Sequence, residues 1–265
     1  MKKVLIPTAL AFAVAGCNST SNTANVNLTV SGTVQSAAAQ TRSLQANSLE
    51  AAQDAMAIEV LNNNEAAGTV ALSQARFVLE EIELDSERDD DDLADDDANE
   101  EDELELAFEG PIIADIISQT LTPELATAEI AAGQYQEIEI DVDPVTEVDW
   151  AAFGGDLAAD DKLRQGYSVH LVGTYTDINA QEYAIEVLLD EDFEKEQSLA
   201  NDLVLTADSV TNLSVTFDLT GLFDDIDLVA LAAAGAIVID SKGDNNDVAD
   251  VIANRIEDSL ELAEE

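Results

Sequence analysis

Residues 128–142 read AEIAAGQYQEIEIDV, and the end of this stretch decides the fold class. Ile138, Ile140 and Val142 alternate there with glutamate and aspartate. Because neighbouring side chains of a strand point to opposite faces, the pattern predicts a strand with one buried face and one wet, acidic face. Such one-sided strands are typical of antiparallel sheets that pack against a second layer.

The same two-residue period recurs along the chain. It is found in residues 26–34, 77–84, 103–109, 167–175, 183–189 and 213–219. Asp, Asn and Gly separate the later segments, where turns are expected. We expect 77–84 and 103–109 to pair with each other across the acidic segment between them.

Three other segments have the apolar spacing of helices. Residues 48–61 begin with Ser48, a good helix N-cap, and 224–234 begin with acidic residues that suit the positive end of a helix dipole. The last helix is predicted over 247–263, as an amphipathic helix that docks one side on the sheets. Its inward positions are Val248, Val251, Ile252, Ile256 and Leu260.

Strands followed by a packing helix predict a mainly β chain. The expected architecture is an antiparallel β-sandwich, prealbumin-like or Ig-like, with a few helices that include the C-terminal one. We interpret 26–265 as one sandwich domain, with two small domains that meet within 144–166 as the alternative. Trp150, the only tryptophan, is expected in the core rather than in an exposed glycan platform.

The first sixteen residues have the pattern of a secretory leader. Lys2 and Lys3 precede an apolar run at 4–14, which is followed by an alanine and a glycine. The run is about half as long as the roughly twenty residues that a membrane-spanning helix needs. Residues 17–25 are rich in Asn, Ser and Thr after the cysteine and are interpreted as a polar tether.

Val14-Ala15-Gly16-Cys17 resembles the lipobox of bacterial lipoproteins. The resemblance implies cleavage after Gly16 and attachment of diacylglycerol to the thiol of Cys17, with acylation of the new amino terminus. Two or three acyl chains anchor a protein to a bilayer almost irreversibly. Because Asn18 is not the aspartate that retains enterobacterial lipoproteins at the inner membrane, the resemblance favours the outer membrane, on its periplasmic or its surface face.

Three features together resemble bacterial lipoproteins that carry a domain of unknown function with a prealbumin-like sandwich. They are the leader, the strand at 77–84, and the sequence Ala132-Gly133-Gln134-Tyr135 that leads into the next strand. This resemblance implies a fold and brings no catalytic residues with it.

The chain has 57 acidic and 10 basic side chains, a formal net charge of -47. Such a charge argues against nucleic acid and anionic lipid headgroups as partners. The densest stretch, 85–103, is interpreted either as a solvated loop kept extended by repulsion or as a loose collector of Ca²⁺. The charge also fits a saline habitat, in which a carboxylate-rich surface stays hydrated.

A second oxygen-rich cluster precedes the last helix. Asp240, Asp244 and Asp247 are candidate Ca²⁺ ligands, although Lys242 occupies the third position of what would be an EF-hand loop. Capping of the helix by Asn246 or Asp247 would explain the cluster without a metal.

The sequence holds little catalytic chemistry. One histidine and one cysteine exclude zinc sites and Cys/His nucleophilic pairs. The strand period places His170 opposite Val169 and Leu171, so a solvent-facing histidine is predicted. No nucleophile elbow or phosphate-binding glycine loop is present in the sequence.

We therefore expect a lipid-anchored, non-enzymatic binding or structural module of the bacterial cell envelope, with an envelope protein, a glycan or divalent cations as its ligand. The alternative is an envelope hydrolase that uses a carboxylate pair or bound calcium, because the acidic clusters could supply either. A cleft that holds close carboxylates with raised pKa values would favour the hydrolase.

Overall fold

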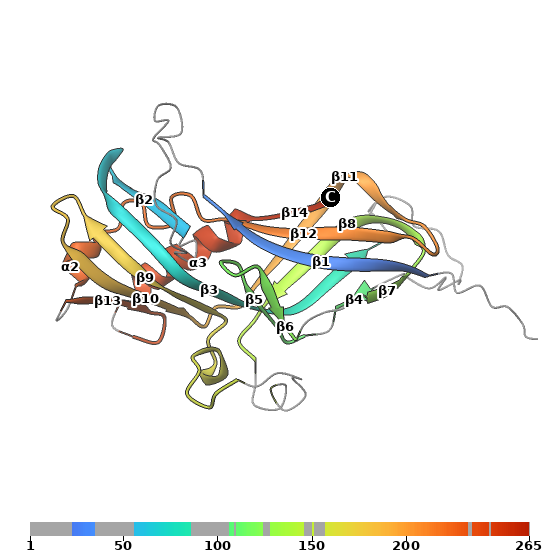
Figure 1. Cartoon of the computed structure of the whole chain (residues 1–265), viewed down its shortest axis with the longest axis horizontal. Helices are drawn as coiled ribbons and strands as arrows, with labels where there is room; N and C mark the ends of the chain where they lie inside the picture. The colour runs from blue at the N-terminus through green and yellow to red at the C-terminus, as the bar shows by residue number, and fades with distance from the viewer. Residues whose placement is uncertain are drawn as a thin grey trace, which may run out of the picture.

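Two packed β-sheets form the body of the protein in a computed structural model (Figure 1). The residues that the structure describes are 23–34, 56–85, 106–108, 110–123, 128–145, 150, 157–232, 235–243 and 245–264. This architecture confirms the predicted mainly β sandwich with a few helices.

The smaller sheet has the strand order β14-β12-β1-β7. Its strands are β1 (Thr23–Thr33), β7 (Ala128–Ala131), β12 (Val210–Asp218) and β14 (Leu260–Glu264). β1 and β12 are parallel, whereas the other two pairs are antiparallel. The sheet is therefore mixed rather than purely antiparallel.

The larger sheet follows the path β11-β8-β3-β9-β10-β13. The strands of this path are β3 (Glu65–Asp85), β8 (Gly133–Val142), β9 (Val169–Asp177), β10 (Glu182–Leu189), β11 (Phe193–Leu205) and β13 (Ala236–Asp240). Four shorter strands lie off this path: β2 (Met56–Asn62), β4 (Leu106–Ala107), β5 (Ile112–Asp115) and β6 (Thr120–Thr122). β10 and β13 run parallel, and the other pairs of this sheet are antiparallel.

The long strand β3 runs along the long axis of the molecule, from one half of the larger sheet into the other (Figure 1). Its first part pairs with β9 over residues 68–77, and its second part pairs with β8 over residues 79–85. β8 and β9 thus follow one another along β3, and the larger sheet is continuous across the 144–166 connection between them.

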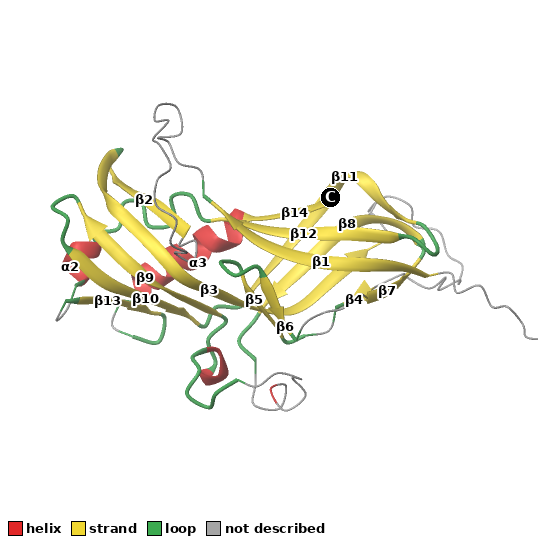
Figure 2. Cartoon of the chain, in the orientation of Figure 1, coloured by secondary structure: helices red, strands yellow, loops and turns green. Residues whose placement is uncertain are grey.

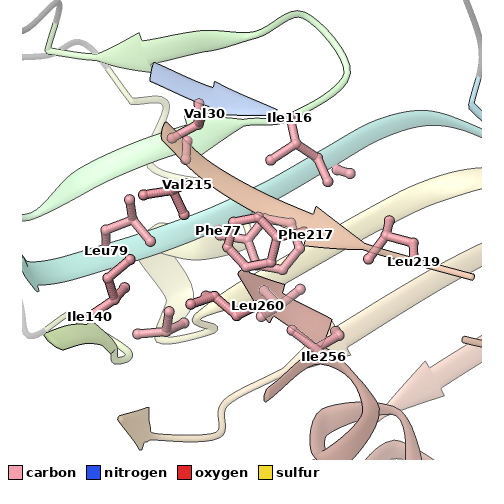
Figure 3. Packing of buried hydrophobic residues seen from close by; sticks show 14 of the residues in the cluster. Val30, Phe77, Leu79, Ile116, Ile140, Val215, Phe217, Leu219, Ile256 and Leu260 are labelled. Atoms are coloured by element: carbon pink, nitrogen blue, oxygen red, sulfur yellow. The ribbon is translucent and has the colours of Figure 1, made fainter. Parts of the chain in front are cut away.

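The inner faces of the two sheets share one hydrophobic core. At its centre, Phe77 of β3 stacks on Phe217 of β12, with 4.2 Å between the ring centroids (Figure 3). Both rings are fully buried, as are Leu79 and Val215 on the same strands. Burial of large apolar side chains is the dominant favourable contribution to folding, so this contact joins the two layers.

Helix α3 (Asn246–Ser259) covers the part of the larger sheet that the smaller sheet does not reach (Figure 2). Its buried side chains are Ala249, Ile252, Ala253 and Ile256. They meet the inner face of β10 and β13, where Ile185 and Ile239 are buried. No described helix is long and apolar enough to cross a membrane.

The predicted pairing across the acidic segment is confirmed. Leu106 and Ala107 of β4 lie opposite Leu84 and Glu83 of β3. The two-residue period correctly predicted β1, β8, β9, β10 and β12, and only the ends of these strands differ from the prediction.

The prediction of a helix at 48–61 is wrong for the part that the structure describes. Met56–Asn62 is strand β2, which pairs with the start of β3. Asn63 and Asn64 both have positive φ angles, 51° and 63°, as the tight turn between hairpin strands requires. Residues 48–55 lie outside the described residues.

The two later helices are shorter than predicted. Among the described residues of the predicted 224–234 helix, only Leu228–Leu231 is helical, as α2. The Asp227 side chain accepts a hydrogen bond from the Ala230 amide at 3.1 Å. The last helix ends at Ser259 rather than 263, because residues from Leu260 onward pair with β12 as β14. Val251, predicted to face inward, is 41% exposed.

Replacement of the central ring tests this account of the core. Phe217→Ala removes a stacked, fully buried ring and should cost about 3–5 kcal/mol in the free energy of unfolding. Val204→Ala, at a position 61% exposed, is the matched control and should change it by less than about 0.5 kcal/mol. Urea unfolding of the three proteins measures both values; similar small losses would refute the central role of the ring.

Candidate functional site

The outer face of β3, β8 and β11 carries a grid of carboxylates. The register places Glu139 of β8 between two direct cross-strand neighbours, Glu83 of β3 and Glu196 of β11. In the next row, Asp141 lies between Glu81 and Glu194.

A third row extends the grid toward the start of β8, where Glu137 lies opposite Asp85. These acidic positions alternate with the buried residues Ile82, Leu84 and Ile138, which face the core. Burial of every second side chain fixes the register of the strands. This register places the acidic side chains directly opposite one another.

A small hollow of about 60 Å³ lies within this acidic face. It is lined by Glu83, Leu84, Asp85, Glu137, Glu139 and Glu196. Lys195 is the only basic residue of β8, β11 and the described segment 81–85, and it lies opposite Ile140, on the core side of the pleat. The direct cross-strand neighbours of Glu139 and Asp141 in the sheet are therefore all acidic.

Three carboxylates of the face, Glu83, Glu139 and Asp141, have raised pKa values. Partial burial, followed by repulsion from Glu81, raises the pKa of Glu83. Burial and then Glu194 raise the pKa of Glu139, and burial and then Asp192 raise that of Asp141. Like charges on directly opposite positions destabilise a sheet, so the face favours any cation that approaches it.

This face is not a preformed chelate. Among the described residues, no three His, Cys, Asp or Glu side chains converge closely enough to hold a metal ion. Neighbouring strands are about 4.8 Å apart, which spreads the carboxylates along the surface instead of around one point. The arrangement can thus attract hydrated cations or the basic groups of a partner.

Removal of one charge from the middle row should stabilise the fold. The raised pKa of Glu139 means that its side chain binds a proton more tightly in the folded state than in the unfolded state. The charged form of Glu139 therefore destabilises the folded state at pH values above the raised pKa. This destabilisation is relieved as the pH falls toward the ordinary value of 4.5. Glu139→Gln should therefore raise the free energy of unfolding by about 0.5 kcal/mol at neutral pH and low salt.

The gain from Glu139→Gln should shrink as salt is added or as pH falls toward 4.5. Glu182→Gln, at an exposed position on β10, is the control and should change stability little. Chemical unfolding at two salt concentrations measures the difference. A loss of stability in the Glu139 variant would contradict the account of repulsion.

A second acidic hollow, of about 360 Å³, lies between α3 and the corner that joins β10 to β11. It is lined by Glu191, Asp192, Phe193, Asp250, Ala253, Asn254 and Glu257. Burial, with Asp190 and Asp250 nearby, raises the pKa of Glu191. This hollow is open and adds to the negative field of the molecule.

The prediction of a solvent-facing His170 is wrong. The histidine is only 7% exposed. It belongs to a row of hydrogen-bonded ionisable side chains on the outer face of the larger sheet. Asp161 accepts two hydrogen bonds from Arg76, at 2.7 and 3.1 Å. Arg76 Nη2 lies 2.8 Å from His170 Nδ1, and His170 Nε2 lies 3.1 Å from Glu186 Oε1.

The donors in this row fix the tautomer of the histidine. Arg76 has only donors, so Nδ1 of His170 must accept, and the ring proton lies on Nε2, where it is donated to Glu186. Burial lowers the pKa of His170, and the Arg76 charge lowers it further, against the opposing pull of Glu186. Protonation would place a donor on Nδ1, directly against the guanidinium.

This row of groups should make the fold sensitive to acid. The pKa of His170 in the folded state lies below the ordinary value of 6.5. The stability that the neutral ring contributes is therefore fully present above pH 6.5 and is lost as the pH falls below 6.5. His170→Gln can keep both hydrogen bonds but cannot titrate.

We expect the His170→Gln protein to lose less stability than the natural protein between about pH 7.5 and about pH 5. The carboxylates of the acidic face act in the opposite direction and are common to both proteins, so the difference between the two unfolding curves isolates the histidine. Parallel curves would contradict this role.

The predicted calcium ligands are not brought together by the described residues. Asp240 Oδ1 accepts from the Tyr167 hydroxyl at 3.1 Å and from the Lys242 amide at 2.9 Å. Burial and this hydrogen bond raise the pKa of Tyr167 to about 12. Asp247 lies in the first turn of α3, where its charge suits the helix dipole, and Asp244 is outside the described residues.

The helix cap itself differs from the prediction. Asn245, rather than Asn246 or Asp247, is the N-cap residue of α3, and its side chain makes no capping bond. Its amide instead binds the end of β13, accepting from the Asp240 amide at 3.1 Å and donating to the Val238 carbonyl. Asn245 therefore ties the helix to the sheet.

The prediction that Trp150 belongs to the core is confirmed. It is 8% exposed and packs in a second hydrophobic cluster on the outer face of the larger sheet, with Val78, Ile113, Val145 and Leu163. Val145, Trp150 and Leu163, described residues of the connection from β8 to β9, thus cover this face beside Arg76. Cys17 and residues 86–103 lie outside the described residues.

No protein-family model, curated protein or solved structure matches the chain. The resemblance to bacterial lipoproteins therefore stays a prediction. Nothing in the described part of the chain positively indicates enzymatic activity.

Proposed function

We propose that the protein is a lipid-anchored, non-enzymatic binding module of the bacterial cell envelope whose acidic sheet face holds divalent cations. One observation carries the binding role: three neighbouring strands align their carboxylates row by row, with Glu139 between Glu83 and Glu196. This arrangement costs stability unless a cation relieves it.

The chemistry of the face favours calcium and magnesium held loosely. Hard divalent cations prefer carboxylate oxygens, and an unbalanced negative surface concentrates them. Because the described carboxylates do not converge, we propose that the ions keep most of their water and exchange readily. Loosely held ions could bridge the face to an anionic glycan or to another acidic envelope protein.

The lipobox sequence supports the anchor. Diacylglycerol on Cys17 and acylation of its amino group would hold the module to a membrane, and the outer membrane is the proposed location. Residues 17–22 would join the lipid to the sandwich domain, because Thr23–Asn25, predicted as the end of the tether, are the first residues of β1.

Calcium binding is tested with matched charge variants. The triple change Glu83→Gln, Glu139→Gln and Glu196→Gln removes the middle row of the face. The control removes three exposed carboxylates outside it, at Glu59, Glu65 and Glu182. Equilibrium dialysis with radioactive Ca²⁺ at low ionic strength should show a clear loss of bound calcium in the first protein and a much smaller loss in the second.

The two variants carry the same net charge, so the comparison separates the arrangement of the charges from their number. Equal losses of calcium would mean that the ions respond only to net charge, and the proposed face would be rejected. Magnesium should compete with calcium, and monovalent salt should displace both.

The anchor is tested by growth of the expressing bacterium with labelled fatty acid. The natural chain should incorporate the label, and Cys17→Ser should abolish it, because the thiol is the proposed attachment point. Equal labelling of the two proteins would remove the proposed anchor.

A further inference from the structure

We infer that the end of the sandwich where β1 begins rests against a bilayer surface of zwitterionic lipid, an orientation that depends on the proposed anchor at Cys17. Two turns form this end of the molecule, the β11–β12 turn and the β7–β8 turn (Figure 1). The start of β1 is hydrogen-bonded into the first of them. The Asp208 amide donates to the Thr23 carbonyl at 2.9 Å, and the Asn25 amide donates to the Ser209 carbonyl at 2.8 Å.

The length of chain between the anchor and the sheet sets the distance. Six residue steps separate Cys17 from Thr23, the first residue of β1. A fully extended chain covers at most about 3.6 Å per residue, so the lipid cannot lie more than about 22 Å from this end. The β9–β10 turn lies at the opposite end (Figure 1). Gly68 of β3 pairs with Asp177 beside that turn, and β3 runs from there to Asp85, roughly 56 Å at strand spacing, so the opposite end is outside this reach.

This end is poorer in charge than the chain as a whole, in which more than one residue in five is acidic. The segments that build it are 23–26, 128–135 and 202–212. Their 23 residues contain three carboxylates, those of Glu129, Asp202 and Asp208, and no basic side chain. An end with few charges is the part of so acidic a molecule that can approach lipid headgroups with the least loss of hydration energy.

Two exposed valines border the β11–β12 turn. Val204 is 61% exposed and Val210 is 64% exposed. Val204 precedes the turn on β11 and Val210 follows it on β12, so they flank the tip. Exposed apolar side chains at the edge of a surface with few charges suit the boundary between headgroups and acyl chains.

The acidic face explains the choice of zwitterionic lipid. It begins at Glu137, four residues beyond Gly133 at the start of β8, or roughly 13 Å from the tip at strand spacing. Because the whole chain carries a formal net charge of -47, a negatively charged membrane would repel it, most strongly at low ionic strength, whereas zwitterionic lipid would not.

Fluorescent labels test the orientation in the full lipidated chain. Cys17 is the only cysteine and would be blocked by lipid, so Val210→Cys and Val204→Cys each give one free thiol for an environment-sensitive dye. Ile178→Cys, in the β9–β10 turn and 72% exposed, is the matched control. The three proteins are reconstituted in phosphatidylcholine vesicles that contain a lipid-borne quencher.

We expect at least threefold stronger quenching of the dye at 204 and 210 than at 178, with all three proteins floating with the vesicles. Flotation with equal quenching at all sites would overturn the orientation and leave the anchor intact. Failure of the natural chain to float would overturn the anchor and the orientation together.

Discussion

The contact between Phe77 and Phe217 is the interaction on which the rest of the structure depends. It joins the longest strand of the larger sheet to the strand that organises the smaller one, and it lies at the centre of a core shared by both sheets. The inner face of β3 is held by this contact. β3 pairs in a fixed register with β8, and β8 pairs with β11, so the outer side chains of the three strands lie in rows. The same packing that buries the isoleucines and leucines of these strands aligns their carboxylates on the other side.

Most of the fold could be predicted from local patterns. Alternating segments such as 136–142 and 183–189 reveal strands because one face is buried and the other is wet. The prediction for residues 48–61 was wrong because the four-residue spacing of Met56 and Val60 fits both a helix and a strand. The turn at Asn63 and Asn64, which follows, favours the strand. The parallel pairs and the final strand depend on contacts between distant segments, which local spacing does not contain.

Only part of the candidate site could be predicted from the sequence. The acidic face of β8 follows directly from its alternation, but its alignment with β3 and β11 depends on register. His170 was misjudged because a strand pattern reports which residues share a face and says nothing of a loop that covers it. Arg76, a lone basic residue inside an acidic chain, was the available signal of a buried ion pair.

The pairing of β1 with β12 has a consequence for folding. These neighbours in the smaller sheet are about 185 residues apart, and β14, which borders β12, is the last strand of the described residues. Synthesis delivers β1 long before its partner strands. The smaller sheet can therefore close only after the chain through β14 has been made, and the long intervening segment makes such closure slow.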